Sequence, residues 1–402
     1  MDTSNDTGGQ PMGPGHILFV SNLYPRPDEP QRGQFNGAMV RALGDAAARR
    51  GLRVAVLVPV AERDVRRFAS IRGWTVPGEA ACEASVQYVP YLHVPYLGRP
   101  FAGYACWQAL RAHRALFKGA VGVIGSWLYP DAVAAHALAQ ALGRPHVARL
   151  HGSDRYHLDA WWRGRLSRRC LSGSVAVAVN ASTMWDELVA RGVDAGRISV
   201  IPNGVDEQRF RPPDAGTREK GTVLWVGHLI EVKDPARALR VFRMLVEGEN
   251  PGGRDYRLQI VGAGPLRVRL QNQVHAWNGQ EQIQFLGELG SDALAEAMRR
   301  ASCLLLTSRS EGMPNVVLEA LSSGTPVVCV PAGDTPKVVR DAVNGYCVAA
   351  SGADGDRRLA AALHQAMARE WDDESVRSTV SAYRWSQSAE RLLDLLGAGK
   401  AG

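Results

Sequence analysis

Residues 304–330 read LLLTSRSEGMPNVVLEALSSGTPVVCV and decide the fold. The run 304–306 is short, apolar and followed by small polar residues, which is typical of a buried parallel strand. Pro314 is tolerated in the first turn of a helix, and Gly324 with Pro326 ends that helix before a second apolar run. The stretch therefore predicts one strand–helix–strand unit.

Two carboxylates flank the start of the predicted helix. Glu311 lies on the loop before it, and Glu319 lies four residues past Asn315, on the same face. The helix start offers unpaired N–H groups and a positive dipole end, which suit a phosphate. Beside an anion site, the two carboxylates make sense as ligands of neutral hydroxyls, those of a sugar and a ribose. By spacing alone, two solvated glutamates on a surface helix are the better supported alternative.

The segment from Ser310 to Ala320 resembles the E-x7-E signature of retaining glycosyltransferases with the GT-B fold, in the large group also called family four. The match continues through GTPVV at 324–328 and is far more specific than a lone glycine motif. The resemblance implies an α/β fold with two Rossmann-like, doubly wound domains that face a central cleft. It also implies that Glu311 holds donor-sugar hydroxyls and Glu319 the nucleotide ribose, and it displaces the alternative of solvated glutamates.

The composition is that of a globular protein with two domains. With 402 residues, 46% of them hydrophobic and 22% charged, the chain is long enough for two cores. The 47 basic and 40 acidic residues give a net charge of +7, which favours anionic partners such as nucleotides and phospholipid headgroups. A uniformly solvated basic surface is the alternative.

The cysteines and the hydropathy indicate the compartment. Six scattered cysteines, with Cys303 and Cys329 in expected buried strands, fit reduced thiols in a cytosolic protein. No apolar run approaches the ~20 residues of a membrane span. We therefore expect a cytoplasmic protein, soluble or peripheral on the inner face of the cell membrane.

The order of elements predicts the domain boundaries. A strand, a glycine loop, a helix and a strand follow one another between residues 16 and 59, which is the doubly wound pattern. The expected segments are a disordered tail at 1–15, a first domain at 16–206, a linker at 207–221, a second domain at 222–384, and a crossover helix with its tail at 385–402.

Loops of the first domain carry the candidate acceptor-side residues. Open α/β sheets bind ligands at the carboxyl ends of their strands, and such loops are expected at 125–131 and 151–154. The second, HGSD, resembles the family's H-G-x-D segment, whose histidine approaches the transferred sugar. Gly33 matches a glycine of the family that lets the first domain approach donor and acceptor. Without the resemblance, a structural histidine explains position 151 better, and a surface turn glycine explains position 33 nearly as well. The candidate acceptor-side residues are Gly33, Trp127, Tyr129 and Asp154.

Tryptophans and arginines gather at residues 155–169. Five arginines within these fifteen residues flank two tryptophans, as on an interfacial membrane surface. A basic helix face packed at one end by its tryptophans is an equally supported alternative. The candidate membrane residues are Trp161, Trp162, Arg163 and Arg165.

The second domain offers two further loops to a donor. One runs from Gly227 to Lys233, and the other reads GAGPL at 262–266. The latter invites a dinucleotide interpretation, but position 267 is Arg where that fingerprint needs glycine. It resembles instead the G-x-G-P-L loop of the glycosyltransferase second domain. The candidate donor-binding residues, besides Glu319, are Gly227, His228, Gly264, Pro265, Leu266, Gly312, Met313, Pro314, Asn315, Val316 and Val317.

The chain departs from the family pattern at two positions. His228 stands where the family usually has an arginine that works with the lysine matched by Lys233, and Lys337 stands where a glutamate often precedes two valines. A histidine is charged only when it is protonated. We therefore expect His228 to assist Lys233 with the donor phosphates, and donor affinity to fall as pH rises through about 7–8. Lys337 is tolerable if it only lines the pocket.

The resemblance implies a retaining, metal-independent hexosyltransferase without a cofactor. It would move a hexose from a nucleotide diphosphate sugar to a lipid-linked or oligosaccharide acceptor in polysaccharide or glycolipid biosynthesis, in the bacterial surface-polysaccharide or teichuronic-acid-type subgroup. Glu311, His151 and Lys233 are the candidate catalytic residues, and Lys233 with the helix start would stabilise the departing diphosphate. No nucleic acid is expected as a partner. No metal is expected either, because the D-x-D at 354–356 lies in a late polar stretch interpreted as a solvated loop.

Two other functions stay open. A nicotinamide dehydrogenase needs a complete glycine fingerprint and an acidic residue about twenty positions on, which the sequence lacks. A non-catalytic nucleotide-sugar-binding subunit of a glycosyltransferase complex is favoured by His228 alone. Donor binding without turnover would identify such a subunit.

Overall fold

The computed structural model describes residues 15–30, 32–62, 64, 84–92, 101–112, 117–152, 154–213, 218–248, 256–349 and 352–397. The chain forms two compact units, one of residues 1–202 with 385–402 and one of residues 203–384. Nearly all of the expected disordered tail lies outside the described residues.

The second unit begins at residue 203, earlier than the boundary expected at 206. The Asn203 side chain donates a hydrogen bond to Asn315 Oδ1 at 3.0 Å, which ties this segment to the second unit. The described part of the expected linker also packs there, because Arg218 forms an ion pair with Asp373 at 2.8 Å. These long-range contacts are invisible in the composition of the segment.

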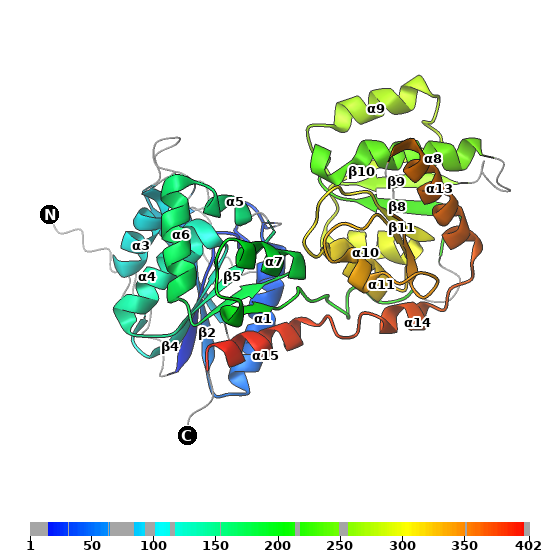
Figure 1. Cartoon of the computed structure of the whole chain (residues 1–402). Coiled ribbons are helices and arrows are strands. Elements are labelled where there is room, and N and C mark those ends of the chain that lie inside the picture. The colour runs from blue at the N-terminus through cyan, green and yellow to red at the C-terminus, as the bar shows by residue number, and fades with distance from the viewer. Residues whose placement is uncertain are drawn as a thin grey trace. The chain divides into compact units, whose positions relative to one another are not determined.

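The described strands of the first unit form a parallel sheet in the order β3-β2-β1-β4-β5-β6-β7 (Figure 1). They are β1 (His16–Val20), β2 (Arg53–Ala61), β3 (Ala84–Tyr91), β4 (Ala120–Ser126), β5 (His146–Leu150), β6 (Ala176–Val179) and β7 (Ile198–Val200). The helical segments are α1 (Gln34–Ala48), α3 (Ala102–Ala112), η4 (Leu128–Ala132), α4 (Val133–Leu142), α5 (Arg155–Leu158), α6 (Trp161–Gly173), α7 (Ser182–Ala190), η5 (Ala195–Arg197) and α15 (Trp385–Leu395).

Alternate residues of β1 face opposite sides of this sheet. Ile17 and Phe19 pack in the cluster that includes α1 and α15, whereas Leu18 and Val20 pack in the cluster that includes α3 and α4. Side chains alternate in this way along any strand. Since both faces are covered, β1 is apolar from Ile17 to Val20, as the sequence predicts for a buried parallel strand.

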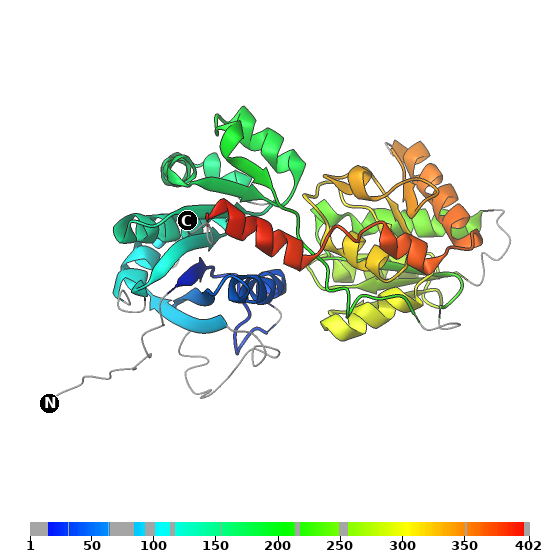
Figure 2. The ribbon, with the colours of Figure 1, turned by 90° about the horizontal axis from the view of Figure 1, so that it is seen from below.

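The C-terminal helix α15 lies beside α1 in the first unit (Figures 1 and 2). Its buried side chains include Leu392 and Leu393, and they complete the apolar layer over that face of the sheet. At the rim, Arg50 forms ion pairs with Glu390 at 2.6 Å and with Asp394 at 2.8 Å.

The described strands of the second unit form a parallel sheet in the order β10-β9-β8-β11-β12-β13. They are β8 (Thr222–Val226), β9 (Arg257–Val261), β10 (Ile283–Gly287), β11 (Cys303–Leu306), β12 (Val327–Cys329) and β13 (Gly345–Cys347). The helical segments are η6 (Glu231–Lys233), α8 (Pro235–Glu247), α9 (Arg267–Ala276), α10 (Ser291–Arg300), α11 (Asn315–Ser322), α12 (Thr335–Val338), α13 (Gly352–Ala368) and α14 (Asp373–Ser378). The predicted strand–helix–strand unit is β11–α11–β12, and the doubly wound α/β fold is confirmed in both units.

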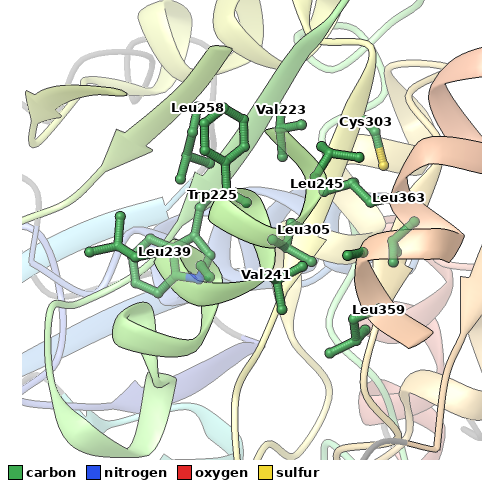
Figure 3. Close-up of a cluster of buried hydrophobic side chains, with 14 of the residues drawn as sticks. Val223, Trp225, Leu239, Val241, Leu245, Leu258, Cys303, Leu305, Leu359 and Leu363 are labelled. Carbon is green, nitrogen blue, oxygen red and sulfur yellow. The ribbon is translucent and has the colours of Figure 1, made fainter. Parts of the chain in front are cut away.

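The second unit has its own core, in which strand side chains meet those of α8 and α13 (Figure 3). Trp225 of β8 is 1% exposed and lies among Leu239, Leu305 and Leu359. Its indole N–H donates to Thr307 Oγ1 at 3.1 Å, so the largest core residue leaves no buried donor unpaired. Cys303 of β11 is buried in the same cluster, as expected.

The D-x-D at 354–356 lies on α13, so its interpretation as a solvated loop is wrong. Asp356 is buried and forms ion pairs with Arg237 at 2.7 Å and Arg240 at 2.9 Å, both on α8. Asp354 is exposed and pairs with Arg358, one turn along α13, at 3.7 Å. The sequence could not show this difference, because the partners of Asp356 lie more than a hundred residues earlier in the chain.

Candidate functional site

Each sheet has a point at which its strand order reverses direction. In the first unit β1 and β4 are neighbours there, and in the second β8 and β11 are. Open α/β sheets bind ligands outside the carboxyl ends of the strands at such a point. Among the residues selected from the sequence, Trp127 follows β4, Lys233 follows β8 and Glu311 follows β11.

In the second unit the two loops meet through Lys233 and Glu311. The Lys233 ammonium lies 2.6 Å from Glu311 Oε1 and 2.8 Å from Oε2, so it contacts both carboxylate oxygens. The Glu311 side chain is 9% exposed and that of Lys233 28%. An ammonium has three N–H groups, and two of them serve Glu311. The third remains for an anion.

The Lys233 backbone is fixed by the neighbouring Asp234. Asp234 has φ 47°, and its carboxylate accepts the Arg237 N–H at the start of α8. Its other oxygen accepts from Arg309 Nε at 2.9 Å, and its carbonyl accepts from the Thr307 hydroxyl at 2.9 Å. These bonds join the loop after β8 to the loop after β11, so Lys233 and Glu311 are held by the same contacts.

The start of α11 carries the remaining donor-side candidates. Pro314 is the N-cap residue, and Met313, Pro314 and Val317 are buried, whereas Gly312, Asn315 and Val316 are half-buried. Asn315 is held by Asn203, as described above. The first N–H groups of α11 therefore directly follow the loop that carries Glu311.

Glu319 lies further along α11 with a carboxylate that has no hydrogen-bond partner among the residues that the structure describes. Burial raises the pKa of Glu319 to about 7, and the nearby charge of Arg209 opposes this rise. A half-buried carboxylate that the fold leaves unbonded is suited to a ligand that brings its own donors.

The glycine-rich loop after β9 packs against the loop after β8. Gly262 has φ +131°, and a Cβ there would lie 1.9 Å from the Gly227 carbonyl oxygen. Gly264 has φ +156°, and a Cβ there would lie 2.6 Å from the Leu229 carbonyl oxygen. These two glycines thus allow a close approach of backbones that other residues would prevent. Of the other candidates here, Leu266 donates its N–H to the Leu229 carbonyl, and Pro265 and His228 are exposed.

In the first unit, His151 lies at the end of β5 within a buried polar network. Its Nε2 is 3.0 Å from Ser126 Oγ at the end of β4 and 3.5 Å from Arg149 Nη1 on β5. Ser126 Oγ and Arg149 Nη1 each lie 3.0 Å from Asn36 Oδ1 in the first turn of α1. Burial, and next the charge of Arg149, lower the pKa of His151 well below its ordinary value, so the ring is neutral at physiological pH.

Asn36, Ser126 and Arg149 were not among the residues selected from the sequence. A signal for Arg149 was available, because it is a lone charged residue within an apolar strand, and such residues are rarely buried without partners. Asn36 and Ser126 belong to no sequence pattern that indicates a site.

Aromatic rings and a strained residue surround His151. The Phe35 ring lies edge-on with its centroid 4.9 Å away, and the Trp127 indole stacks at 5.6 Å. Trp127 has φ +83°, a conformation that a tryptophan rarely adopts. Tyr129 is buried, and its hydroxyl accepts the Gly103 N–H at 3.2 Å. An outlier of this kind costs energy and is commonly found at a ligand site.

Asp154 and Gly33 support these loops through backbone contacts. Asp154 accepts the Leu128 N–H at 3.0 Å and the His151 N–H at 2.8 Å, which joins the loops after β4 and β5. Burial raises the pKa of Asp154 to about 7, while the two N–H donors lower it. Gly33 precedes α1 with φ +59°, and a Cβ there would lie 2.2 Å from the Leu23 carbonyl oxygen. An acceptor contact by either residue stays a prediction.

The tryptophan and arginine candidates lie on α6, at the surface of the first unit. Trp161 is 85% and Trp162 44% exposed, and their ring centroids lie 5.9 Å apart. Arg165 is exposed and Arg163 half-buried. Within the described part of the chain, no helix is both long and apolar enough to cross a membrane, and no three His, Cys, Asp or Glu side chains gather as metal ligands.

Family models match both units. The model of glycosyl transferases group 1 matches residues 206–382, and that of glycosyltransferase family 4 matches residues 37–209. Each unit of the chain thus resembles a glycosyltransferase family.

Curated relatives include a D-inositol 3-phosphate glycosyltransferase of Actinosynnema mirum, 30% identical over 51% of this chain and 52% of the relative. The putative teichuronic acid biosynthesis glycosyltransferase TuaC of Bacillus subtilis is 24% identical over 79% of this chain and 81% of the relative. The chain spans about half the length of the first curated relatives that it matches.

Crystal structures with the same fold include Anabaena HepE in complex with UDP, with a TM-score of 0.68 and 15% identity over 96% of this chain and all of HepE. A sucrose-phosphate synthase from Thermosynechococcus elongatus has a TM-score of 0.71 and 18% identity over 95% of this chain and 98% of that protein. At these identities the likeness shows the fold alone.

Proposed function

We propose that this protein is a retaining glycosyltransferase that moves a hexose from a nucleotide diphosphate sugar to a lipid-linked or oligosaccharide acceptor, without a metal or cofactor. The observation that carries the proposal is the Lys233–Glu311 ion pair. Glu311 lies on the loop just ahead of α11, and the unbonded carboxylate of Glu319 lies on that helix. The UDP bound to HepE and the names of the curated relatives support a nucleotide-sugar donor.

The ion pair supplies both charges that the reaction needs. A diphosphate leaves as an anion, and the third N–H of Lys233 with the first N–H groups of α11 stabilises that negative charge. Glu311, neutralised by Lys233, is free to accept hydrogen bonds from sugar hydroxyls without repelling the phosphates as a lone anion would. Glu319 accepts the ribose hydroxyls, and His228 assists Lys233 from its exposed position after β8.

The proposed transfer needs no nucleophile from the protein. The departing phosphate takes the proton of the acceptor hydroxyl, while the sugar carbon moves from the phosphate oxygen to the acceptor oxygen. His151 contributes a hydrogen bond to a sugar hydroxyl from the first unit. The exposed tryptophans and the arginines of α6 support an acceptor that is held at an anionic membrane. A saccharide of the bacterial cell surface is the product that fits this arrangement and the relative TuaC.

The test is transfer by Glu311→Ala, measured over a panel of nucleotide sugars with lipid-linked and free saccharide acceptors. We expect turnover to fall about 10²-fold, because a hydrogen bond to a charged group contributes roughly 1.5–3 kcal/mol. Glu247→Ala, which removes an exposed glutamate paired with Arg243 on α8, is the matched control and should keep full activity. Near-normal turnover by a folded Glu311→Ala protein would refute the assignment. Donor binding without turnover in the wild type would identify a binding subunit instead.

A further inference from the structure

A buried network of Asn36, Ser126 and Arg149 surrounds one edge of the His151 ring. The three side chains come from α1, β4 and β5, and each residue is at most 1% exposed. Polar groups buried this deeply must satisfy one another, because an unpaired buried donor or acceptor costs free energy. The directions of their hydrogen bonds can therefore be deduced one after another, beginning with Asn36.

The orientation of the Asn36 amide is fixed first. Its Nδ2 lies 2.7 Å from the Leu23 carbonyl oxygen, which can only accept, so this atom must be the N–H₂ group. Oδ1 therefore faces Ser126 Oγ and Arg149 Nη1, at 3.0 Å each, and accepts from both. If the Asn36 amide were flipped, its oxygen would face the Leu23 carbonyl oxygen, and its N–H₂ group would face the N–H groups of Arg149.

The Ser126 hydroxyl then determines the His151 tautomer. Ser126 has one proton, and it points to Asn36 Oδ1, because two acceptors 3.0 Å apart would otherwise repel. Ser126 Oγ is left as the acceptor for His151 Nε2, also 3.0 Å away, so Nε2 carries the proton. Arg149 Nη1 is 3.5 Å from Nε2, too far for a strong competing bond.

Arg149 also prevents a second proton from binding to the ring. Its guanidinium lies 3.5 Å from Nε2 of the ring, and a protonated imidazole beside it would place two cations in a buried site. The acidic group in contact is Asp154, whose two oxygens accept backbone N–H groups, and Asp131 lies close to Asp154. The ring is thus neutral, with Nδ1 unprotonated and without a hydrogen-bond partner among the described residues.

We propose that Asn36, Ser126 and Arg149 are positioning residues that hold His151 as the neutral Nε2–H tautomer and leave Nδ1 to accept a hydrogen bond from a substrate hydroxyl. The rings of Phe35 and Trp127 fix the plane of the imidazole from two sides. The proposal rests on the proposed glycosyl transfer, because that reaction supplies the hydroxyl. It adds that the histidine acts only as an acceptor and does not donate a proton.

The tautomer is tested by two-bond ¹H–¹⁵N spectra of the protein labelled on histidine, in which His151→Gln identifies the signal of His151. We expect the Nε2–H form from about pH 5 to about pH 8 in the wild type. Arg149→Met should shift the titration of His151 towards the ordinary range of histidine, and Arg149→Lys should keep it low. If Arg149→Met does not fold, the comparison of Arg149→Lys with the wild type still reports whether the charge suffices.

Ser126→Ala should give a mixture of tautomers, and Ser174→Ala is its matched control. The Ser174 hydroxyl accepts from His146 Nδ1 at 2.8 Å and donates to the Cys170 carbonyl at 2.7 Å, so it forms a second buried Ser–His pair in the same unit. Ser174→Ala should leave the His151 signal unchanged. An Nδ1–H tautomer in the wild type, or equal effects of the two substitutions on His151, would overturn the proposal.

The second measurement is kcat/KM for glycosyl transfer. We expect Ser126→Ala to lower kcat/KM for transfer by about tenfold, the effect of about one neutral hydrogen bond, and Ser174→Ala to leave it unchanged. Unchanged kcat/KM in Ser126→Ala would show that the tautomer does not matter for the reaction. Because the spectra require no substrate, an inactive wild type with the Nε2–H tautomer would count against the proposed function and not against the network.

Discussion

At the level of single residues, Glu319 is a group whose charge changes near neutral pH. Burial raises the pKa of its carboxyl group to about 7, and the charge of Arg209 opposes that rise. Two neighbouring ribose hydroxyls donate two hydrogen bonds, and the ionised carboxylate accepts both, whereas the protonated form must use one oxygen as a donor. Bound hydroxyls therefore favour the ionised form and lower the pKa of Glu319 in the complex.

The affinity for UDP should consequently rise as pH increases towards about 7, because binding to the protonated form requires release of its proton. Each pH unit below that point should cost up to about tenfold in affinity. Calorimetric titrations across this range, with the wild type and Glu319→Gln, measure the effect. The phosphates of UDP titrate in both proteins, so the difference between the two profiles isolates Glu319.

Glu296→Gln is the matched control, because Glu296 is an exposed glutamate on the neighbouring α10. Glu319→Gln should lose the rise in affinity towards neutral pH, and Glu296→Gln should keep it. A rising side that persists unchanged in Glu319→Gln would show that Glu319 does not bind the nucleotide.

The sequence predicts single residues well only where a motif names them. Glu311, Glu319 and His151 could be selected because the spacing of their neighbours is characteristic of a family. The Lys233–Glu311 ion pair and the network around His151 could not, because each joins residues from separate strands and helices. The direction of a hydrogen bond depends on all of its neighbours at once, and a linear sequence does not contain those neighbours.

At the scale of elements, local patterns predicted β11, α11 and β12, because a strand, a glycine and a helix start each have a local signature. They failed for α13, because the partners of Asp356 lie on α8. The ion pairs of Asp356 with Arg237 and Arg240 connect two helices that cover the same core. A buried carboxylate between two guanidinium groups therefore joins elements that are distant in sequence.

Asp356→Ala should lower the free energy of unfolding of the second unit by roughly 1–3 kcal/mol, because it removes a buried carboxylate that pairs with the half-buried Arg237. Asp354→Ala removes an exposed ion pair two residues away and should change that free energy of unfolding by less than about 0.5 kcal/mol. Urea unfolding followed by the fluorescence of Trp225 and its neighbours measures both variants. Equal effects of the two substitutions would mean that the pair between α8 and α13 adds nothing.

The exposed face of α6 makes a second prediction at this scale. Vesicles that contain anionic phospholipid should bind the wild type in a salt-sensitive manner, because tryptophan rings insert at the interface and arginines attract the headgroups. Replacing Trp161, Trp162, Arg163 and Arg165 with serine should abolish this binding and leave donor hydrolysis intact. Val268→Ser with Arg269→Ser, an exposed apolar and basic pair on α9, is the control and should bind normally. Unchanged sedimentation of the fourfold variant with vesicles would show that the α6 face is only structural.

At the scale of the whole molecule, each unit has its own sheet and its own apolar core, and the chain enters the first unit twice. The second entry is α15, whose Leu392 and Leu393 are fully buried in the cluster that contains α1. The expected crossover helix at 385–402 is therefore an integral layer of the first unit. Residues 385–395 thus complete the apolar core of that unit, although most of the unit precedes the second unit in sequence.

Leu392→Ala should accordingly destabilise the first unit by about 2–5 kcal/mol, the cost of a cavity at a buried leucine. Hydrogen exchange followed by mass spectrometry should show faster exchange in peptides from residues 15–202 and 385–397, and little change in peptides from 203–384. Leu363→Ala, at a fully buried leucine of α13, is the matched substitution and should give the reverse pattern. The two variants together decide whether stability is local to each core. If each one accelerates exchange throughout the chain, the units unfold as one cooperative body, and the C-terminal helix stabilises more than the core in which it lies.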